Sequence, residues 1–434
     1  MRILILSQYW LPENGVPQRR WAWLTGLLVQ AEHEVTVVTP PPHYERQIGW
    51  RNWWRQRGFS PSPQVEVGQQ GENIIRTGYV PSGHSIPQKV LNQLGVAAGA
   101  LRVIKDWGRF EGGSRPDLII GTVPALPTAF ITWRAARRFR VPYLIDLRDA
   151  WPQLLDNAQT WNDAQRSSPL SHHPALGFVQ GLLLTPVKVV LRWIYAKSDG
   201  LMVTSDKLAQ VMSRDMRYCK RQSIFTVRNV FPSESNSPKR NPSPAGTLNV
   251  LYAGTLGRAQ RLDNALYAAK WASQKGVDIN LVFIGSGVAR QRLRQTAREL
   301  DLKVRFESRR NASELSELYA WADTALVHLT DWSPLEMTVP SKTYELMQLG
   351  LHITGVVSGE TAELIESLDA GHTVPPSNPE RLGELWVELA NNKEKLTVGG
   401  KARQWVEDQR ERVAPKALSD AIDAASGCTD HREV

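Results

Sequence analysis

The sequence predicts two doubly wound α/β domains that face each other across a cleft. Short apolar runs alternate with helical runs, which is typical of parallel sheets covered on both faces. The succession of strand, glycine-bearing turn, helix and strand occurs at Ile3–Pro40 and again at Leu248–Gly287. Between these halves, Pro232–Gly246 is rich in Pro and Ser and nearly free of apolar residues, which predicts a linker.

The elements follow in the order that this class requires. A strand at Ile3–Trp10 precedes a helical run at Gln18–Gln30 and a strand at Glu34–Pro40, and the second half repeats this with Leu248–Gly257, 262–273 and Ile279–Gly287. Further strands are expected at 117–123, 143–149, 200–206, 225–230, 303–308, 324–329 and 352–357. The predicted domains are 1–231 and 247–402, joined by the linker 232–246 and followed by a helical tail, 403–434, expected to cross back onto the first domain.

Composition excludes several classes of protein. Of the 434 residues, 42% are hydrophobic and 22% charged, which excludes global disorder. The only cysteines, Cys219 and Cys428, exclude a disulfide framework and a cysteine-based zinc site, and the histidines form no ligand pattern, so no metal is expected. Ile3–Leu6 is too short for a signal-peptide core, and Gly181–Lys197 is interrupted by proline and charges. We expect a soluble or peripheral cytoplasmic protein.

Charge is distributed unevenly along the chain, whose net charge is +9. Residues 1–231 carry 28 Lys and Arg against 16 Asp and Glu, whereas residues 232–434 carry 24 against 27. A basic first half suggests an anionic partner, namely phospholipid, nucleic acid or a phosphorylated substrate. The alternative is that the excess charge serves solubility alone.

A first candidate phosphate site is the turn at Gly254–Leu266, between a strand and a helix. Gly254 allows close backbone approach, Arg258 and Arg261 offer charge-assisted hydrogen bonds, and the helix N-terminus attracts anions. The alternative is an ordinary turn with surface arginines. The Gly-Ser-Gly sequence within Phe283–Arg290 lacks a full dinucleotide fingerprint, so tight packing of strand against helix is the favoured role.

A second candidate is the helix start within Val339–Gly350. Ser341 is expected as the N-cap, with Lys342 in the first turn and Glu345 on the same face. A cation and a carboxylate placed in this way suit a nucleotide sugar, with Lys342 meeting phosphate and Glu345 accepting from ribose hydroxyls. A solvated helix end with a mutual ion pair is the alternative.

A third candidate, in the other half, is the strand end at Tyr143–Pro152. Asp146, Arg148 and Asp149 follow one another there, and Asp146 and Arg148 share one side if the strand stays extended. Carboxylates facing the cleft could act as a base or position a hydroxyl. A salt-bridged strand end is the alternative.

Aromatic and basic residues interleave in the segment that ends at Phe59. Its predicted membrane or acceptor residues are Trp50, Arg51, Trp53, Trp54 and Arg55. Indole rings and cations together suit a bilayer interface. The same mixture could stack on single-stranded nucleic acid, or the tryptophans could pack in a loop-rich corner.

Taken together, these blocks resemble the GT4 glycosyltransferases over nearly the whole chain. The resemblance rests on SQYWLPENGVPQRR, YLIDLRDAWP, LYAGTLGRAQRL, FIGSG and VPSKTYELMQLG with GETAELIESLDAGHTVPP. The nearest subgroup is that of bacterial cell-surface polysaccharide enzymes, which transfer an amino sugar or similar residue onto a lipid-linked acceptor. The resemblance implies a GT-B fold of two Rossmann-like domains, retention of anomeric configuration and no metal or other cofactor. It places a nucleotide-sugar donor in the second domain and the acceptor in the first.

Carried over by position, Gly15 would lie against the donor diphosphate, Arg258 would bind it, and Lys342 and Glu345 match the PSK…E segment. This sequence departs from the family pattern in three places. The first glutamate of a pair eight residues apart is replaced by Met337, with Glu336 beside it as a possible donor-sugar ligand. Arg148 stands where many members have histidine, and Arg261 stands where the nearest subgroup often has glycine.

The expected function is a retaining glycosyltransferase that moves a sugar, with a UDP-sugar as the expected donor, to a lipid-linked or saccharide acceptor at an anionic membrane surface. It would act in cell-surface polysaccharide biosynthesis as a hexosyl- or N-acetylhexosaminyl-transferase. No carboxylate nucleophile is evident, so double displacement is not supported. The alternatives are another GT-B enzyme, such as a nucleotide-sugar epimerase, and a basic nucleic-acid-binding protein, for which no motif is present.

Overall fold

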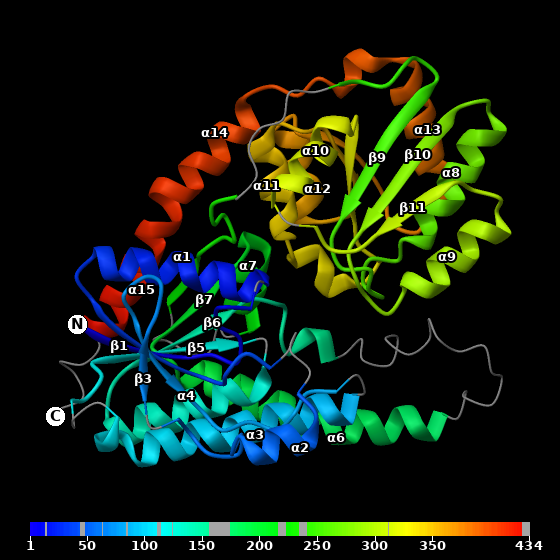
Figure 1. Ribbon diagram of the computed structural model, residues 1–434. Coiled ribbons are helices and arrows are strands. Elements are labelled where there is room, and N and C mark those ends of the chain that lie inside the picture. The colour runs from blue at the N-terminus through cyan, green and yellow to red at the C-terminus, as the bar shows by residue number, and fades with distance from the viewer. Residues whose placement is uncertain are drawn as a thin grey trace.

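The computed structural model describes residues 1–13, 15–43, 48–62, 64–83, 86–110, 114–123, 125–155, 174–215, 223–233, 241–310 and 312–427. Over these residues the chain forms two lobes, each built around a sheet with helices on both faces (Figure 1). The predicted class of two doubly wound, Rossmann-like domains is therefore confirmed. Residues 234–240 of the predicted linker and 428–434 of the predicted tail lie outside the described residues.

Within the described residues, the first sheet has eight strands in the order β3-β4-β2-β1-β5-β6-β7-β8. Their bounds are β1 (Arg2–Leu6), β2 (Glu34–Thr39), β3 (Val65–Val67), β4 (Asn73–Arg76), β5 (Leu118–Val123), β6 (Tyr143–Leu147), β7 (Gly200–Val203) and β8 (Ser223–Thr226). All neighbours pair in parallel except β3, which runs antiparallel to β4 at the edge. β3 and β4 were not expected from the sequence, because β3 is exposed throughout and β4 has only two apolar residues.

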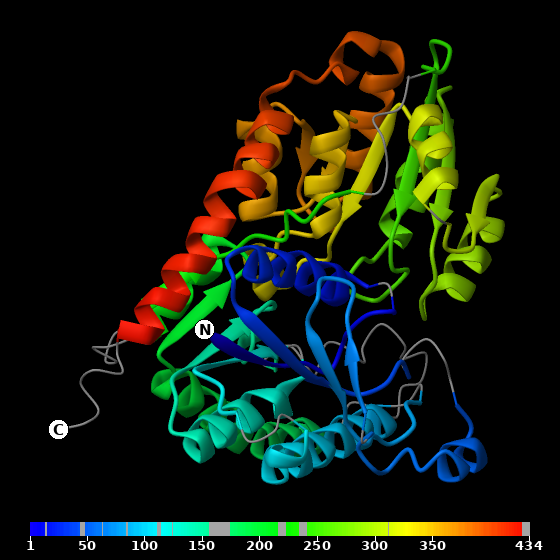
Figure 2. The ribbon, with the colours of Figure 1, turned by 60° about the vertical axis from the view of Figure 1, so that its left-hand side comes forward.

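Helices cover both faces of this sheet. They are α1 (Val16–Gln30), α2 (Trp50–Arg55), α3 (Ile86–Lys105), α4 (Leu126–Phe139), α6 (Pro174–Lys197) and α7 (Asp206–Asp215). Ile3 and Ile5 of β1 pack in the same cluster as residues of α1, whereas Leu4 and Leu6 pack with residues of α3 and α4. This alternation follows from the two-residue period of a strand. α1 lies between the first sheet and the second domain in both views (Figures 1 and 2).

Across the described part of the second domain, six strands pair in parallel in the order β11-β10-β9-β12-β13-β14. They are β9 (Thr247–Ala253), β10 (Asp278–Ile284), β11 (Val304–Glu307), β12 (Thr324–His328), β13 (Ile353–Val356) and β14 (Gly371–Val374). The helices are α8 (Asp263–Gln274), α9 (Arg290–Glu299), α10 (Ala312–Trp321), α11 (Ser341–Leu349), α12 (Glu360–Ser367) and α13 (Pro379–Asn391). β14 was not expected, because its sequence GHTV has a single fully buried residue at the end of the strand.

The C-terminal segment passes from the second domain to the first. α14 (Lys401–Asp408) packs on α11, a π-helical turn spans Gln409–Val413, and α15 (Ala414–Gly427) packs on β7 and β8. Both ribbon views show this continuous helix descending from the upper lobe to the lower one (Figures 1 and 2). Arg410 connects this segment to both domains. Its Nε donates to the Val230 carbonyl of the first domain and its Nη2 donates to Gln348 Oε1 on α11, each at 2.6 Å.

Candidate functional site

Three polar side chains form a closed cluster in the second domain. Lys342 Nζ donates to the Tyr319 hydroxyl at 2.9 Å and to Glu345 Oε2 at 3.0 Å, and the Tyr319 hydroxyl donates to Glu345 Oε1 at 3.1 Å. The mutual ion pair that the sequence left as an alternative is therefore present. It is not a solvated pair, because the side chains of Lys342 and Glu345 are only 29% and 12% exposed.

Tyr319 is a member of this cluster that the sequence did not indicate. It lies on α10, is fully buried, and has its ring centroid 5.7 Å from Lys342 Nζ. Burial raises the pKa of its hydroxyl well above the usual value, and the charge of Glu345 raises it further. The hydroxyl therefore stays protonated and can donate to Glu345. Its apolar neighbours on α10 gave it the pattern of a core residue, so no sequence signal marked its polar role.

The start of α11 differs by one residue from the prediction. Ser341 is the first helical residue, and Pro340 occupies the N-cap position without a side-chain hydrogen bond. Thr343 N–H donates to the Pro340 carbonyl at 2.9 Å. Ser341 is thus not the cap, and α11 begins with backbone N–H groups that no side chain satisfies, which is the arrangement that favours an anion.

The turn after β9 is held by close backbone contacts with the turn after β10. A Cβ on Gly285, whose φ is +142°, would come 1.9 Å from the Gly254 carbonyl oxygen, and one on Gly287 would come 2.2 Å from the Leu256 carbonyl oxygen. Only glycine permits this approach. The Gly-Ser-Gly sequence was predicted to pack a strand against a helix; the close contact observed instead joins the turn after β10 to the turn after β9. This contact fixes the backbone on which Arg258 and Arg261 lie.

Arg261 has an unusual backbone conformation, with φ of +37°. A left-handed φ favours glycine, which gives a physical reason for glycine at this position in the resembling subgroup. Its exposed guanidinium donates from Nη1 to Ser377 Oγ at 3.2 Å. Arg258 lies three residues earlier, partly buried, and its carbonyl accepts from Arg261 N–H at 3.3 Å.

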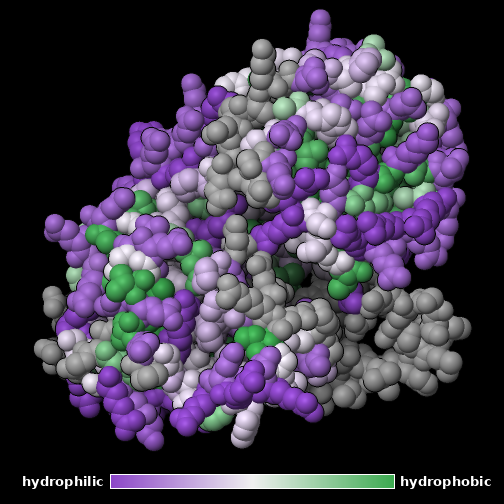
Figure 3. Space-filling view, viewed as in Figure 1, coloured by the Kyte–Doolittle hydropathy of each residue, from purple (hydrophilic) through white to green (hydrophobic). Residues whose placement is uncertain are grey.

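The N-terminal end of α1 approaches this cluster from the first domain. Gly15 is the N-cap of α1, which has neither a side-chain cap nor an acidic residue in its first turn. Arg19 lies close enough to Tyr319 for its charge to oppose the raised pKa of that hydroxyl. Its guanidinium stacks 4.7 Å over the Phe231 ring and donates to the Pro232 carbonyl at 3.1 Å. Figure 3 shows the surface hollowed between the two lobes.

Arg148 and Asp149 lie directly after β6, partly buried. Within the described part of the chain, Arg148 Nε and Nη1 are buried and have no hydrogen-bond acceptor. Burial lowers the pKa of the Arg148 guanidinium and raises the pKa of the Asp149 carboxyl, and each charge opposes the shift of the other. Unused donors beside a carboxyl with a raised pKa suit a ligand that carries an anionic group and hydroxyls.

Asp146 requires a correction. Its side chain is fully buried, and Arg20 Nη2 donates to its Oδ1 at 2.8 Å while Trp21 Nε1 donates to its Oδ2 at 2.8 Å. The carboxylate is therefore committed to α1 and does not face a substrate. Arg20 was missed because a charge within an amphipathic run predicts a solvent-facing position, whereas this one is fully buried.

Two family models match most of the sequence. "Glycosyl transferase 4-like domain" matches residues 15–229, and "Glycosyl transferases group 1" matches residues 233–412. The chain belongs to the GT4-type glycosyltransferases. This assignment supports the transfer of a sugar from a nucleotide-sugar donor. No curated protein matches the sequence significantly.

Solved structures share the GT-B fold of this glycosyltransferase. Sucrose-phosphate synthase from Thermosynechococcus elongatus is 16% identical with a TM-score of 0.60, and the match covers 99% of this chain and 97% of that one. Anabaena HepE in complex with UDP-glucose is 13% identical with a TM-score of 0.61, covering 98% and 100%. WaaG, a glycosyltransferase involved in lipopolysaccharide biosynthesis, is 15% identical with a TM-score of 0.59, covering 98% and 100%. At these identities the likeness concerns the fold, and the GT-B prediction is confirmed.

Met337 occupies the position where many family members have the first glutamate of the pair, and here it packs between the two domains. Met337 is buried and belongs to a hydrophobic cluster made mainly of first-domain residues, and its carbonyl accepts from Ser205 Oγ. Glu336, beside it, is exposed. Gly359 packs on the Glu336 backbone, where a Cβ would come 2.2 Å from the carbonyl oxygen.

The aromatic segment of this enzyme divides into exposed and buried residues. Trp50 and Trp54 are 56% and 69% exposed, and Arg51 and Arg55 are exposed beside them. Trp53 is 8% exposed and its Nε1 donates to the Tyr79 carbonyl at 2.8 Å. Trp53 is therefore a structural residue, which corrects its predicted place on the membrane or acceptor surface.

The described residues contain neither a membrane-spanning helix nor a group of side chains placed to hold a metal. None of the described helices is long and apolar enough to cross a membrane. Among the same residues, no group of three or more His, Cys, Asp and Glu side chains is placed to hold a metal ion.

Proposed function

We propose that this enzyme is a retaining, metal-independent glycosyltransferase that moves a hexosyl or N-acetylhexosaminyl residue from a UDP-sugar. The acceptor is a lipid-linked or other saccharide at an anionic membrane surface, in the synthesis of a cell-surface polysaccharide. The observation that carries the proposal is the Lys342–Glu345–Tyr319 cluster, set opposite the N-terminal end of α1. The UDP complex of the structurally similar Anabaena HepE favours uridine as the base.

The cluster retains the capacity to bind a nucleotide. The Lys342 ammonium has three N–H donors, of which Tyr319 and Glu345 use two, so one can meet a phosphate. The Glu345 carboxylate accepts two hydrogen bonds and has lone pairs left for ribose hydroxyls. Tyr319 fixes both side chains, so little reorganisation accompanies binding.

Electrostatic stabilisation of the leaving diphosphate would drive the reaction. Negative charge develops on the diphosphate as the glycosidic bond breaks, and preorganised cations and N–H dipoles act on such charge. Arg258, Arg261 and Lys342 supply the cations, and the starts of α1 and α11 supply the dipoles. On the other side, Asp149 can accept a hydrogen bond from the acceptor hydroxyl, since its raised pKa brings it nearer the range of a general base. Arg148 would bind an anionic group of the acceptor.

Nucleotide binding is tested by thermal shift against UDP, GDP, ADP and dTDP and their common sugars. A ligand of the native state raises the melting temperature, and at a hundred times its Kd it adds about 2.7 kcal/mol. We expect selective stabilisation by UDP and by one UDP-sugar, unchanged by EDTA. Selective stabilisation by another base would correct the donor, and the absence of any shift, together with the absence of UDP release in the presence of acceptor lipids, would refute the proposal.

Membrane association is tested with the Trp50→Ser/Trp54→Ser variant. Exposed indoles insert at headgroup depth, and the adjacent arginines attract anionic lipid. We expect the variant to lose most of its cosedimentation with anionic vesicles. Tyr267→Ser is the control, since Tyr267 is a 47% exposed aromatic residue of the second domain. Equal sedimentation of both variants would show that this segment does not bind membranes.

A further inference from the structure

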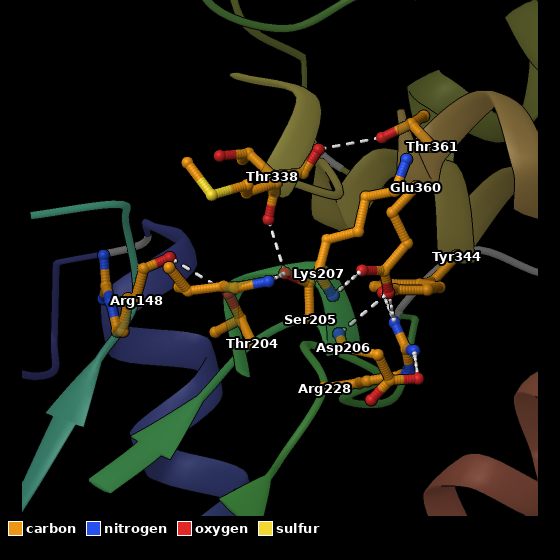
Figure 4. A network of polar contacts seen from close by, with 12 residues as sticks. Arg148, Thr204, Ser205, Asp206, Lys207, Arg228, Thr338, Tyr344, Glu360 and Thr361 are labelled. Carbon is orange, nitrogen blue, oxygen red and sulfur yellow. Dashed lines mark hydrogen bonds and ion pairs between the residues drawn. The ribbon is translucent and has the colours of Figure 1, made fainter. Parts of the chain in front are cut away.

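A buried polar network joins the two domains, and Glu360 lies at its centre (Figure 4). Glu360 is the first residue of α12 in the second domain, and its side chain is 6% exposed. Its Oε1 accepts from Asp206 N–H at 3.1 Å, and its Oε2 accepts from Lys207 N–H at 2.7 Å. Both donors belong to the first turn of α7 in the first domain. A carboxylate of one domain therefore caps a helix of the other.

The cap is reinforced by a buried cation. Arg228, which follows β8, donates from Nη1 to Glu360 Oε1 at 2.5 Å and to the Tyr344 hydroxyl at 3.2 Å. Its Nη2 donates to Asp206 Oδ2 at 2.5 Å. The Arg228 side chain is 6% exposed, so solvent and salt screen the pair weakly. Tyr344 lies on α11 beside Glu345, so the network reaches the helix that carries the donor-binding residues.

Neighbouring hydroxyls connect the same network to the other candidate residues. Thr204 Oγ1 donates to the Arg148 carbonyl at 3.0 Å, and Ser205 Oγ donates to the Met337 carbonyl. Thr361 Oγ1 donates to the Thr338 carbonyl at 2.8 Å, which ties the start of α12 to the segment that contains Glu336. In the turn before α7, Thr204 thus contacts Arg148, and the next residue, Ser205, contacts the second domain.

We propose that Glu360 is a positioning residue for sugar transfer. The inference rests on the proposed function, in which the donor lies on α11 and the acceptor group meets Arg148 and Asp149. By capping α7 across the domain boundary, Glu360 sets the separation between these two halves of the site. It acts through α7, Arg228 and Tyr344 and does not itself bind the substrate.

The test compares Glu360→Gln with Glu363→Gln. Glutamine keeps the shape of glutamate and one acceptor oxygen. Its NH₂ group is a donor, however, and would face the other donors of the cap, namely the α7 N–H groups and the Arg228 guanidinium, so at least one hydrogen bond is lost. Glu363 is the matched control, since it lies three residues further along α12, and its 65% exposed side chain binds Lys207 Nζ at 2.6 Å. Four quantities are measured for each variant: amide exchange at the start of α7, radius of gyration by X-ray scattering, kcat, and the affinity for UDP.

For Glu360→Gln we expect faster exchange at residues 206–207, a larger radius of gyration and a kcat lowered about 10- to 100-fold, since misplacement by an ångström has effects of this size. The affinity for UDP should fall much less than kcat, because the Lys342–Glu345–Tyr319 cluster that would hold the nucleotide lies in the second domain and only the start of α1 would contact it from the first. This split distinguishes positioning from general damage. Glu363→Gln should match the wild type. Wild-type exchange at α7, or an unchanged kcat despite faster exchange, would overturn the proposal.

The exchange and scattering results do not depend on turnover. If the wild-type enzyme showed no transfer from any nucleotide sugar while Glu360→Gln still loosened α7 and expanded the molecule, the proposed function would fail and the docking role of Glu360 would stand. Loss of UDP binding in parallel with kcat would instead assign Glu360 a structural role in the second domain and refute positioning.

Discussion

Lys342→Ala and Glu345→Ala variants are expected to lose transferase activity by about 10²- to 10³-fold in kcat/KM while remaining folded. Removing a single preorganised donor to developing negative charge has effects of this size. Under the proposed function, Lys342→Ala removes a cation that would meet the leaving diphosphate, and Glu345→Ala removes the acceptor for the ribose hydroxyls. Both side chains lie at the helix start and are partly exposed, so their loss leaves no large cavity. Initial rates of UDP release measure the effect.

Lys275→Ala is the matched control for the lysine. Lys275 also lies over an aromatic ring, with its Nζ 5.3 Å from the Trp271 ring centroid, but it follows α8 away from the cluster. Its replacement should leave the rate of UDP release unchanged. Near-normal turnover in both Lys342→Ala and Glu345→Ala would refute the assignment of the donor site.

Asp146→Asn is expected to destabilise the first domain by about 3–5 kcal/mol, because it strands a buried charge. Arg20 keeps its contacts with the Val227 carbonyl at 2.8 Å and Asn229 Oδ1 at 3.0 Å but loses its only anionic partner among its described contacts. At roughly 2–4 °C per kcal/mol for a domain of this size, the unfolding midpoint should fall by about 10 °C. Differential scanning calorimetry measures it.

The control for the buried Arg20–Asp146 pair is the exposed Arg2–Asp117 ion pair of the same domain. Its side chains are 43% and 38% exposed, so Arg2→Ala should move the midpoint by a small fraction of the shift seen for Asp146→Asn. Replacing both buried partners, as Arg20→Met with Asp146→Leu, should recover part of the lost stability, since no charge is then stranded. A midpoint for Asp146→Asn equal to that of Arg2→Ala would show that the buried pair contributes nothing.

The regular elements were predictable where the apolar pattern is local and strong. The strands that flank both glycine-bearing turns follow from sequence because near-continuous apolar runs have few other stable arrangements than a covered parallel sheet. The ends of the predicted strands were less accurate. β8 ends at Thr226, short of the expected Val230. The Val227 N–H still donates to the Val203 carbonyl of β7, whereas the carbonyls of Val227 and Arg228 accept from Arg20.

Two members of the Lys342–Glu345–Tyr319 cluster were predictable from sequence, but the third member and the arrangement of the cluster were not. Lys342 and Glu345 were named from their spacing on one helix, and they do contact each other. Tyr319, which holds both, comes from a different helix, and nothing in its own segment distinguishes it from a core residue. Trp53 and Trp54 are adjacent in sequence, yet Trp53 is buried against Tyr79 and Trp54 is exposed. Adjacent residues of a helix point in different directions, and the sequence did not show which face of α2 packs on the domain.

By itself, the sequence determined the class of fold and the family, because apolar periodicity and glycine-bearing turns act over a few residues. Only the tertiary structure decided which charged groups are free to meet a substrate. Asp146 is committed to Arg20, 126 residues away, and Glu360 caps a helix 154 residues away. Burying a charge is unfavourable unless a partner is placed against it, and only the folded chain places such partners.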